Sequence, residues 1–333
     1  MADATISLCM VVKNEESSIE RCLKSVRDLV DEIIIVDTGS SDNTLSICKQ
    51  YTNHIHLVDW ENDFAKARNY SLQFATGDWI VWLDADEEFD RTTFEDLKSV
   101  LQHKKETFLY VPVRNYIGDT ISEHDVYTIF QARIFQNNKG ITFQNKIHEQ
   151  IHIPVEDFQY AILPSLIKHY GYLNAEIETK NKHERNLDIL KLELESEGHS
   201  PWIDYHVASE YYNAKDYEKA FHFVNYAILK FVEEGVLPPA IVYRLKYSII
   251  VESENYQGAW PSINKAIELY PDYVDLYYLK ATVLFHLGKY QEAVEVLDHC
   301  LLLGEENHNY LILKGTGSFR AVDLKEKCLQ KLQ

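Results

Sequence analysis

Residues Trp79–Glu88 read WIVWLDADEE, an apolar run that ends in two carboxylates, Asp84 and Asp86, at positions i and i+2. The run predicts a buried strand. Residues two apart in an extended segment point to the same side, so both acids are expected to face one divalent cation while Ala85 faces away. Mg²⁺ and Mn²⁺ are held by few carboxylates and keep positions for the oxygens of a substrate diphosphate. Alone, Asp-x-Asp also fits a solvated acidic turn.

The same alternation of strand, loop and helix runs through the N-terminal half. Strands are predicted over Ile6–Val12, Glu32–Val36 and Ile55–Val58, and helical patterns follow, one of them beginning at Leu45. This order implies an α/β fold with a parallel sheet and right-handed crossovers, where ligands collect at the carboxyl ends of the strands. The polar residues at such ends are Asn14, Asp37, Asp42, Asp84 and Asp86.

Ordered sequence blocks carry a resemblance to family 2 glycosyltransferases with a GT-A fold. The early blocks are Val11–Glu16, Val36–Thr44, Asp63-Phe64 with Ala67-Arg68-Asn69, and Gly77–Glu87. Later segments similar to the bacterial branch of that family are Arg133–Phe135, Ile147–Glu149 and His169–Tyr172. The resemblance implies inverting transfer of a hexose from a nucleoside diphosphate sugar with the help of Mg²⁺ or Mn²⁺. The donors expected from the family are UDP-glucose and UDP-N-acetylglucosamine.

The resemblance also assigns residues to the nucleotide sugar. Asp37 is expected to contact the base or ribose, and Arg133 the diphosphate. In the family an arginine at the position of Arg68 contacts the nucleotide. The ordinary alternative is a turn cap for Asp37 and a surface arginine for Arg68. The set expected to bind the donor is Val12, Asn14, Glu16, Asp37, Arg68, Asp84 and Arg133.

Inverting displacement needs a base for the acceptor proton and an electrophile for the departing diphosphate. The resemblance implies a metal at Asp86 with Asp84 beside it, and His169 is expected to complete the metal shell or to contact the diphosphate. Glu149 is the leading candidate for the base, and His148 is the alternative. A structural role remains open for each histidine.

Composition excludes several classes of protein. A net charge of −19, from 33 basic and 52 acidic side chains, opposes binding to nucleic acid or to an anionic membrane. The N-terminus lacks signal-peptide features, and no apolar run approaches the ~20 residues of a membrane span, so a cytoplasmic protein is expected. The cysteines form no Cys-x-x-Cys pair and are interpreted as buried thiols of a reducing compartment, without a zinc site. They are Cys9, Cys22, Cys48, Cys300 and Cys328.

From about Ala175 the pattern is helical throughout. One helix is predicted over Ala175–Glu197, and three Tyr-x-x-Ala motifs then begin at Tyr217, Tyr256 and Tyr290. Aliphatic and small residues trail each motif at similar offsets, which resembles tetratricopeptide repeats. The chain of 333 residues is therefore divided into a GT-A domain over 1–173, a connecting helix over 174–200 and a repeat domain over 201–333.

The combined architecture resembles bacterial transferases that modify peptides, including bacteriocin glycosyltransferases that act on cysteine or serine. A Cys or Ser side chain of a peptide is therefore the expected acceptor, and the alternative is a saccharide in cell-surface polysaccharide assembly. A hydrolase is disfavoured because Asp84 and Asp86 lie too close for paired acid and base roles. An adaptor with a decayed catalytic half is disfavoured by the intact acidic motifs. Exposed repeat faces also suggest a homodimer.

Overall fold

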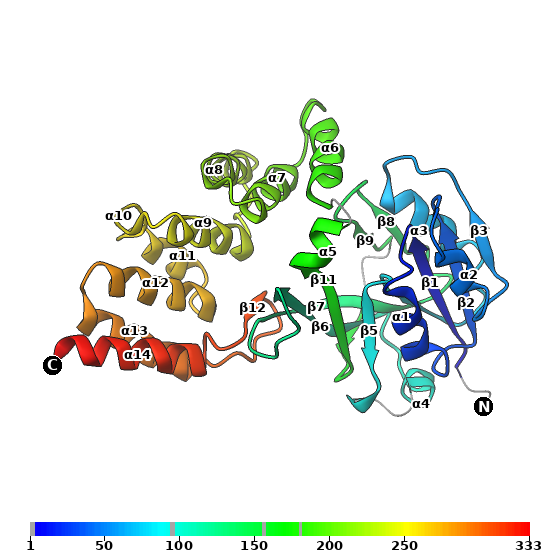
Figure 1. Ribbon diagram of the computed structural model, residues 1–333, viewed down its shortest axis with the longest axis horizontal. Helices are drawn as coiled ribbons and strands as arrows, with labels where there is room; N and C mark the ends of the chain where they lie inside the picture. Colours follow the sequence, from blue (N-terminus) through cyan, green and yellow to red (C-terminus); the bar gives the residue numbers. More distant parts are fainter. Residues whose placement is uncertain (1–3, 94–96, 155–157, 180–181) are drawn as a thin grey trace. The chain divides into compact units, whose positions relative to one another are not determined.

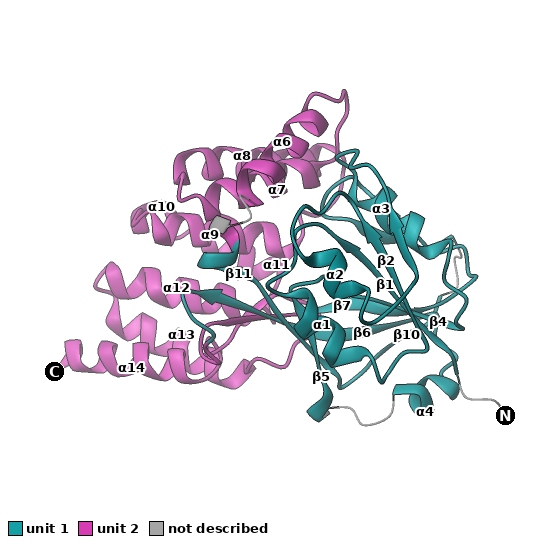
Figure 2. Ribbon diagram, turned by 45° about the vertical axis from the view of Figure 1, so that its right-hand side comes forward, with its two compact units in different colours: residues 1–121, 130–176 teal, residues 122–129, 177–333 magenta. Residues whose placement is uncertain are grey.

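The computed structural model describes residues 4–93, 97–154, 158–179 and 182–333. The chain forms two compact units, coloured separately in Figure 2. Unit 1 comprises residues 1–121 and 130–176, and unit 2 comprises residues 122–129 and 177–333. The division differs from a simple succession along the chain, because a short segment in the middle of the first unit's sequence belongs to the second. The domain limits at 173 and 200 stay predictions.

Unit 1 begins with the predicted alternation of strands and helices (Figure 1). The elements that build its first half are β1 Ile6–Val12, α1 Ile19–Val26, β2 Glu32–Asp37, α2 Thr44–Cys48, β3 Ile55–Leu57, α3 Phe64–Leu72, β4 Trp79–Trp82 and β5 Glu87–Asp90. The elements that follow are a 3-10 turn Arg91–Thr93, α4 Leu97–Gln102, β6 Phe108–Gly118, β7 Val126–Gln136, β8 Thr142–Gln144, β9 Gln150–His152, β10 Tyr160–Ile162, β11 Leu166–Leu173 and α5 Asn174–Thr179.

The main sheet has the strand order β3-β2-β1-β4-β7-β6-β11-β5. The α/β class is confirmed, and the first four strands in this order are parallel, as predicted. Beyond β4 the sheet is mixed, since β7 joins β4 antiparallel and β5 joins β11 antiparallel, whereas β11 runs parallel to β6. Parallel pairing needs a long crossover, whereas β6 and β7 follow each other through a short connection without a helix.

The register aligns the loops that carry the polar residues. Val12 at the end of β1 pairs with Asp37 at the end of β2, and Cys9 pairs with Trp82 at the end of β4. One face of these strands is buried under α3 in a cluster that includes Cys9, Ile34 and Ala65. The apolar core therefore brings the carboxyl ends of β1, β2 and β4 to one edge of the sheet.

Unit 2 is helical and stacks its helices in pairs. The predicted helix Ala175–Glu197 appears as α5 and α6, and its residues 180–181 lie outside the described part. The elements of this unit are α6 Lys182–Leu194, α7 Pro201–Asn213, α8 Tyr217–Glu233, α9 Ala240–Glu252, α10 Tyr256–Ala259, α11 Ile263–Leu269, α12 Val274–His286, α13 Tyr290–Leu303, β12 Ile312–Leu313 and α14 Phe319–Leu332.

The repeat motifs mark equivalent places in these pairs. Tyr217, Tyr256 and Tyr290 each begin a helix. The alanine three positions on is fully buried in every repeat, and the trailing positions are buried as well. In the second repeat Pro261 separates α10 from α11, because a proline interrupts a helix. The predicted repeat phase is confirmed by this burial: Ala220, Val224, Ala227, Ala259, Ile263, Ala266, Ala293, Leu297 and Cys300.

A buried ion pair joins α9 and α12, the helices that precede the second and third repeat motifs. The Arg244 Nε on α9 donates to the Asp275 Oδ2 on α12 at 2.8 Å. Asp275 also accepts from the Thr316 hydroxyl at 2.9 Å and from the Leu313 amide at 3.2 Å. The Arg244 guanidinium lies 4.5 Å from the centre of the Tyr127 ring. This face of α9 and α12 is thus covered by the chain's own segments.

The segment 122–129 is held in unit 2 by further contacts. Thr128 pairs with Ile312 of β12 in an antiparallel bridge. The Arg320 Nη2 donates to the Asp125 Oδ1 at 2.8 Å and to the His124 carbonyl at 2.9 Å. A backbone ladder combined with a charged hydrogen bond explains why this segment groups with the helices.

All of the cysteines are free thiols and buried, as predicted. Burial raises the pKa of Cys9 to about 12 and that of Cys48 to about 11. Burial likewise raises the pKa of Cys300 to about 12. A thiol reacts as its thiolate, so a raised pKa combined with burial suppresses reactivity.

We predict that the native protein does not react with a thiol reagent such as DTNB at pH 8. After denaturation in guanidinium chloride all 5 thiols should react, since unfolding removes the burial that raises each pKa. The measurement is the absorbance of the released thiolate with time, with free cysteine as the control. Rapid reaction of one or more native thiols would contradict the burial described above.

Candidate active site

Hydrogen bonds of Asn14 and Glu16, two residues of the expected donor-binding set, connect the loops after β1 and β2. The Asn14 Oδ1 accepts from the Ser41 amide at 2.8 Å, and the Asn14 amide donates to the Ser40 hydroxyl at 2.9 Å. The Glu16 Oε2 accepts from the Asn43 amide at 2.9 Å. Asn14 and Glu16 therefore hold the loop after β1 against the loop after β2.

Val12, also of the expected donor-binding set, and Asp42 form hydrogen bonds within the same loops. The Val12 carbonyl accepts from the Thr38 amide at 3.0 Å. The Asp42 Oδ1 accepts from the Thr44 amide at 2.9 Å, next to the start of α2, and its Oδ2 accepts from the Glu16 amide at 3.1 Å. Asp42 therefore forms a turn that satisfies the first amide of α2, whose N-cap position is Asn43.

Asp37 combines a structural role with an open acceptor. Its Oδ1 accepts from the amides of Gly39 and Ser40, both at 2.9 Å. Gly39 has φ +100°, a conformation that residues with a side chain rarely adopt. The Asp37 Oδ2 is buried and finds no hydrogen-bond donor among the residues that the structure describes. A buried acceptor without a donor is costly, so this atom is suited to an N–H or O–H group of a ligand.

The acidic motif after β4 is a turn, which corrects the expectation of an extended segment. The strand ends at Trp82, and Ala85 and Asp86 lie in a turn closed by a hydrogen bond of 3.0 Å from the Glu87 amide to the Asp84 carbonyl. The alternation of side chains holds only in extended backbone. Asp84 and Asp86 consequently have different partners.

Asp84 is paired with Arg68 on α3. The Arg68 Nη2 donates to the Asp84 Oδ1 at 2.7 Å, and the Arg68 Nε donates to the Glu149 Oε1 at 2.7 Å. Burial alone would raise the pKa of Asp84, but the guanidiniums of Arg68 and Arg133 outweigh it and hold this pKa below its ordinary value. Through the buried guanidinium of Arg68, these three side chains connect the end of β4 to the loop between β8 and β9.

The block Ala67-Arg68-Asn69 explains how Glu149 reaches Arg68. The Asn69 Nδ2 donates to the Phe143 carbonyl at 2.8 Å, and the Phe143 amide donates back to the Asn69 Oδ1 at 2.7 Å. This pair holds α3 against β8, and the Phe64 amide donates to the Lys146 carbonyl at 2.8 Å. The loop that carries His148 and Glu149 is thereby placed beside Arg68.

Arg133 on β7 is buried beside the same motif. Its Nη2 donates to the Glu87 Oε1 at 2.5 Å, and its guanidinium lies 3.8 Å from the centre of the Trp82 ring. Its Nη1 is 3.9 Å from the Asp84 Oδ2. Neither Nη1 nor Nε has a hydrogen-bond acceptor within the described part of the chain. Two buried donors are therefore available to an anionic ligand.

His169 on β11 faces Asp86. Its Nε2 lies 3.4 Å from the Asp86 Oδ1, and its Nδ1 lies 2.7 Å from the Asn115 Oδ1. The pairing with Asn115 follows from the sheet, because the two residues are register partners on β6 and β11. Burial alone would lower the pKa of His169, but the charges of Asp86, Glu87 and Asp84 outweigh it and raise this pKa above its ordinary value.

A metal ion fits Asp86 and His169 better than it fits the expected set of three ligands. The expected three-ligand set of Asp84, Asp86 and His169 is not a preformed cage, since the described residues contain no group of three or more His, Cys, Asp and Glu arranged to hold a metal. Asp86 and His169 alone suit a cation that takes few protein ligands and completes its shell with phosphate and water. The two guanidiniums of Arg68 and Arg133 pair with the carboxylates of Asp84, Glu87 and Glu149, and Asp86 adds a fourth carboxylate beside His169, so a divalent cation would offset the excess of negative charge.

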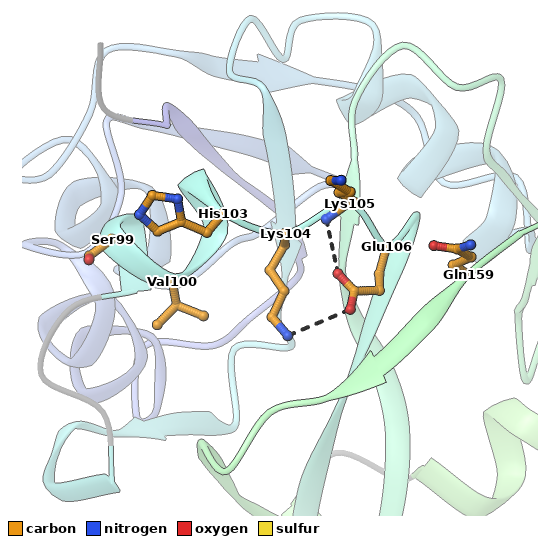
Figure 3. A pocket seen from close by; sticks show the side chains of 7 residues that line it. All are labelled: Ser99, Val100, His103, Lys104, Lys105, Glu106 and Gln159. Carbon is orange, nitrogen blue, oxygen red and sulfur yellow. Dashed lines mark hydrogen bonds and ion pairs between the residues drawn. The ribbon is translucent and has the colours of Figure 1, made fainter. Parts of the chain in front are cut away.

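A separate hollow lies at the other edge of the sheet. It has a volume of about 550 Å³, and Figure 3 shows His103, Lys104 and Lys105 on its wall with Glu106. The strand β6 begins just after the residues that line this hollow. The Thr107 carbonyl, directly before β6, accepts from the Gln136 amide, and Gln136 pairs with Trp79 at the start of β4. The candidate site lies past the end of β4, so this hollow is not part of it.

The sequence interpretation overlooked Trp82, Glu87 and Asn115 as parts of the site. Glu87 is fully buried, and Trp82 lies under both guanidiniums, with Arg68 at 4.5 Å from its ring centre. Burial raises the pKa of Glu87, Arg133 opposes this effect, and Asp84 adds to it. A third acid directly after the two of the Asp-x-Asp motif was a usable signal for Glu87. Asn115 carried no local signal, because only the strand register places it beside His169.

Comparison with known proteins finds similar sequences for both parts of the chain. Residues 7–167 match the family Glycosyl transferase family 2, and residues 263–295 match a tetratricopeptide repeat. A TPR repeat-containing protein of Synechococcus elongatus is 30% identical over 81% of this chain and 66% of its own length. The SPbeta prophage-derived glycosyltransferase SunS of Bacillus subtilis is 28% identical over 84% of this chain and 67% of its own.

The chain thus spans about two thirds of the length of these two relatives. Among solved structures, TarS 1-349 of S. aureus aligns over 85% of this chain and 88% of its own, with 13% identity and a TM-score of 0.39. In the described residues no helix has the length and apolar character to cross a membrane. The chain therefore carries a family 2 glycosyltransferase domain followed by a region of tetratricopeptide repeats.

Proposed function

We propose that this protein is an inverting glycosyltransferase that moves a hexose from a UDP-sugar to a Cys or Ser side chain of a peptide. The observation that carries the transferase assignment is that Asp37 and Arg133 each keep buried polar atoms without a hydrogen-bond partner among the described residues. The Asp37 Oδ2 is an unused acceptor, and the Arg133 Nη1 and Nε are unused donors. An acceptor suits the N–H and O–H groups of a nucleoside, and guanidinium donors suit a diphosphate.

The spacing of these groups supports a nucleoside diphosphate. Asp37 ends β2, Arg133 lies on β7, and the strands β1 and β4 stand between them. Three strand spacings amount to roughly 14 Å. An extended nucleoside diphosphate can bridge such a distance along the carboxyl ends of the strands, the usual place for ligands in this class of fold.

In the proposed reaction the acceptor oxygen or sulfur attacks the anomeric carbon from the side opposite the diphosphate. The bond from that carbon to the diphosphate oxygen breaks, and UDP departs with the electron pair. Glu149, or His148 in its place, takes the acceptor proton. Arg133 donates hydrogen bonds to the departing diphosphate, and Arg68 keeps Asp84 in position beside it. A divalent cation held by Asp86 and His169 would neutralise the charge that develops on the diphosphate.

Two features of the chain support a peptide acceptor. Its net charge of −19 favours encounter with a cationic peptide over an anionic surface. The helix α8 exposes apolar side chains that suit the apolar side of such a peptide: Phe221, Tyr226, Leu229 and Val232. The face of α9 and α12 is covered by residues 311–316, so acceptor recognition is assigned to other surfaces of the repeats.

We predict that Asp86→Ala abolishes transfer and weakens binding of the UDP-sugar in the presence of Mn²⁺, because the diphosphate loses its counter-ion. Asp84→Ala should be nearly as damaging, since it leaves the buried guanidinium of Arg68 with one carboxylate fewer. Calorimetric titration with UDP, with and without Mn²⁺, measures the effect. Near-normal turnover by the Asp86 variant would remove this residue from the site.

A second prediction separates a base from a binding residue. If Glu149 takes the acceptor proton, Glu149→Gln binds the donor normally yet loses turnover by about 10²- to 10⁴-fold. A thiol acceptor, which ionises more readily than a hydroxyl, should lose less. Steady-state kinetics with paired Cys and Ser acceptors measures this. Weaker donor binding with unchanged turnover would make Glu149 a positioning residue for Arg68, and His148→Ala would then be the variant that loses turnover.

The acceptor is tested by mass. Incubation with UDP-glucose or UDP-N-acetylglucosamine and a cationic peptide that contains one Cys should add one sugar to that residue. Matched peptides with Ser or Ala in its place serve as controls, because only the first of them keeps a nucleophile. The Asp86→Ala enzyme provides the inactive reference. Efficient transfer to a saccharide or lipid-linked sugar, with no addition to any peptide of a reasonable panel, would exclude the peptide acceptor.

A further inference from the structure

Glu87 is the most deeply buried carboxylate in and beside the acidic turn. It is 0% exposed, although neighbouring Glu88 keeps about a third of its side chain in solvent at 30%. The resemblance to the glycosyltransferase family gave Glu87 no role. A glutamate is rarely buried completely without a specific partner, so its contacts indicate why it is there.

Both carboxylate oxygens of Glu87 are used within the site. The Oε1 accepts from the Arg133 Nη2 at 2.5 Å, and the Oε2 accepts from the Asp84 amide at 2.9 Å. The first contact fixes one end of the buried guanidinium. The second contact fixes the backbone at the start of the turn that carries Asp84 and Asp86. The Glu87 side chain therefore sets the position of the Arg133 guanidinium and of the acidic turn.

The contact with Glu87 determines which donors of Arg133 stay available. Glu87 takes Nη2, and the Trp82 ring lies against the guanidinium with its centre at 3.8 Å. The Nη1 and Nε atoms keep no hydrogen-bond acceptor inside the described ranges. A planar guanidinium held along one edge presents its remaining N–H groups in a fixed direction, as recognition of a phosphate requires.

We propose that Glu87 is a positioning residue that presents Arg133 to the diphosphate and braces the turn of Asp84 and Asp86. This inference rests on the proposed function, because it assumes that a nucleoside diphosphate is the ligand. Glutamine cannot replace this side chain. An amide has one oxygen, so at least one of the two donors, the Arg133 Nη2 or the Asp84 amide, would face an NH₂ group.

The test is the affinity for UDP measured by calorimetry in Mg²⁺, which needs no turnover. Glu87→Gln is expected to weaken UDP binding by about 10- to 100-fold, the range typical when a residue that orients a ligand-binding group is lost. Glu88→Gln is the matched control. Its Oε2 accepts from the Tyr170 hydroxyl at 2.8 Å, away from Arg133, so UDP affinity should stay at the wild-type value.

A double-mutant cycle shows whether Glu87 acts through Arg133. If it does, Glu87→Gln should weaken UDP binding much less in the Arg133→Ala background than in the wild type. Combination with Asp37→Asn should give additive losses, because Asp37 lies in a separate loop. A purely structural role would lower the melting temperature and leave the UDP affinity of the folded protein unchanged, and that result would overturn the inference.

A further variant keeps the test decisive if Glu87→Gln does not fold. Arg133→Lys retains a cation for Glu87 but lacks the donors Nη1 and Nε, so it should fold and lose UDP affinity. Wild-type affinity in this variant would overturn the inference. Failure of the wild-type protein to bind any nucleoside diphosphate would instead refute the proposed function, and the two failures are thus distinguishable.

Discussion

Burial of two guanidiniums against one indole ring is the constraint on which the site depends. Arg68 and Arg133 lie over the ring of Trp82 and are shielded from water, so each needs a carboxylate nearby. Arg68 is paired with Asp84 and Glu149, and Arg133 with Glu87. These pairs draw β4, β7, α3 and the loop after β8 together.

The strands around this cluster were predictable because each carries its own signal. Apolar runs bounded by turn residues located β1, β2 and β4 to within about a residue, and polar residues at their ends indicated the edge where they meet. The turn after β4 was not predictable from alternation, because the backbone leaves the strand at Trp82. What decides its shape is the hydrogen bond that the Asp84 amide donates to the buried carboxylate of Glu87.

Contacts between distant segments account for what the sequence could not show. Asn115 lies beside His169 only because β6 and β11 are in register, and Glu149 reaches Arg68 only because Asn69 holds α3 against β8. The repeats are the opposite case. Their period is local, so the phase of Tyr217, Tyr256 and Tyr290 located the buried alanines without knowledge of the tertiary structure.

The place of residues 122–129 has a consequence for how this chain can evolve and be recombined. A repeat region that simply followed the catalytic domain could be exchanged between relatives by a single recombination event. Here Thr128 bridges to Ile312, and Asp125 binds Arg320, so the repeats and this internal segment must match each other. A chimera with a foreign repeat region therefore also needs the corresponding residues of the segment 122–129. Natural exchange of the helical region is constrained in the same way.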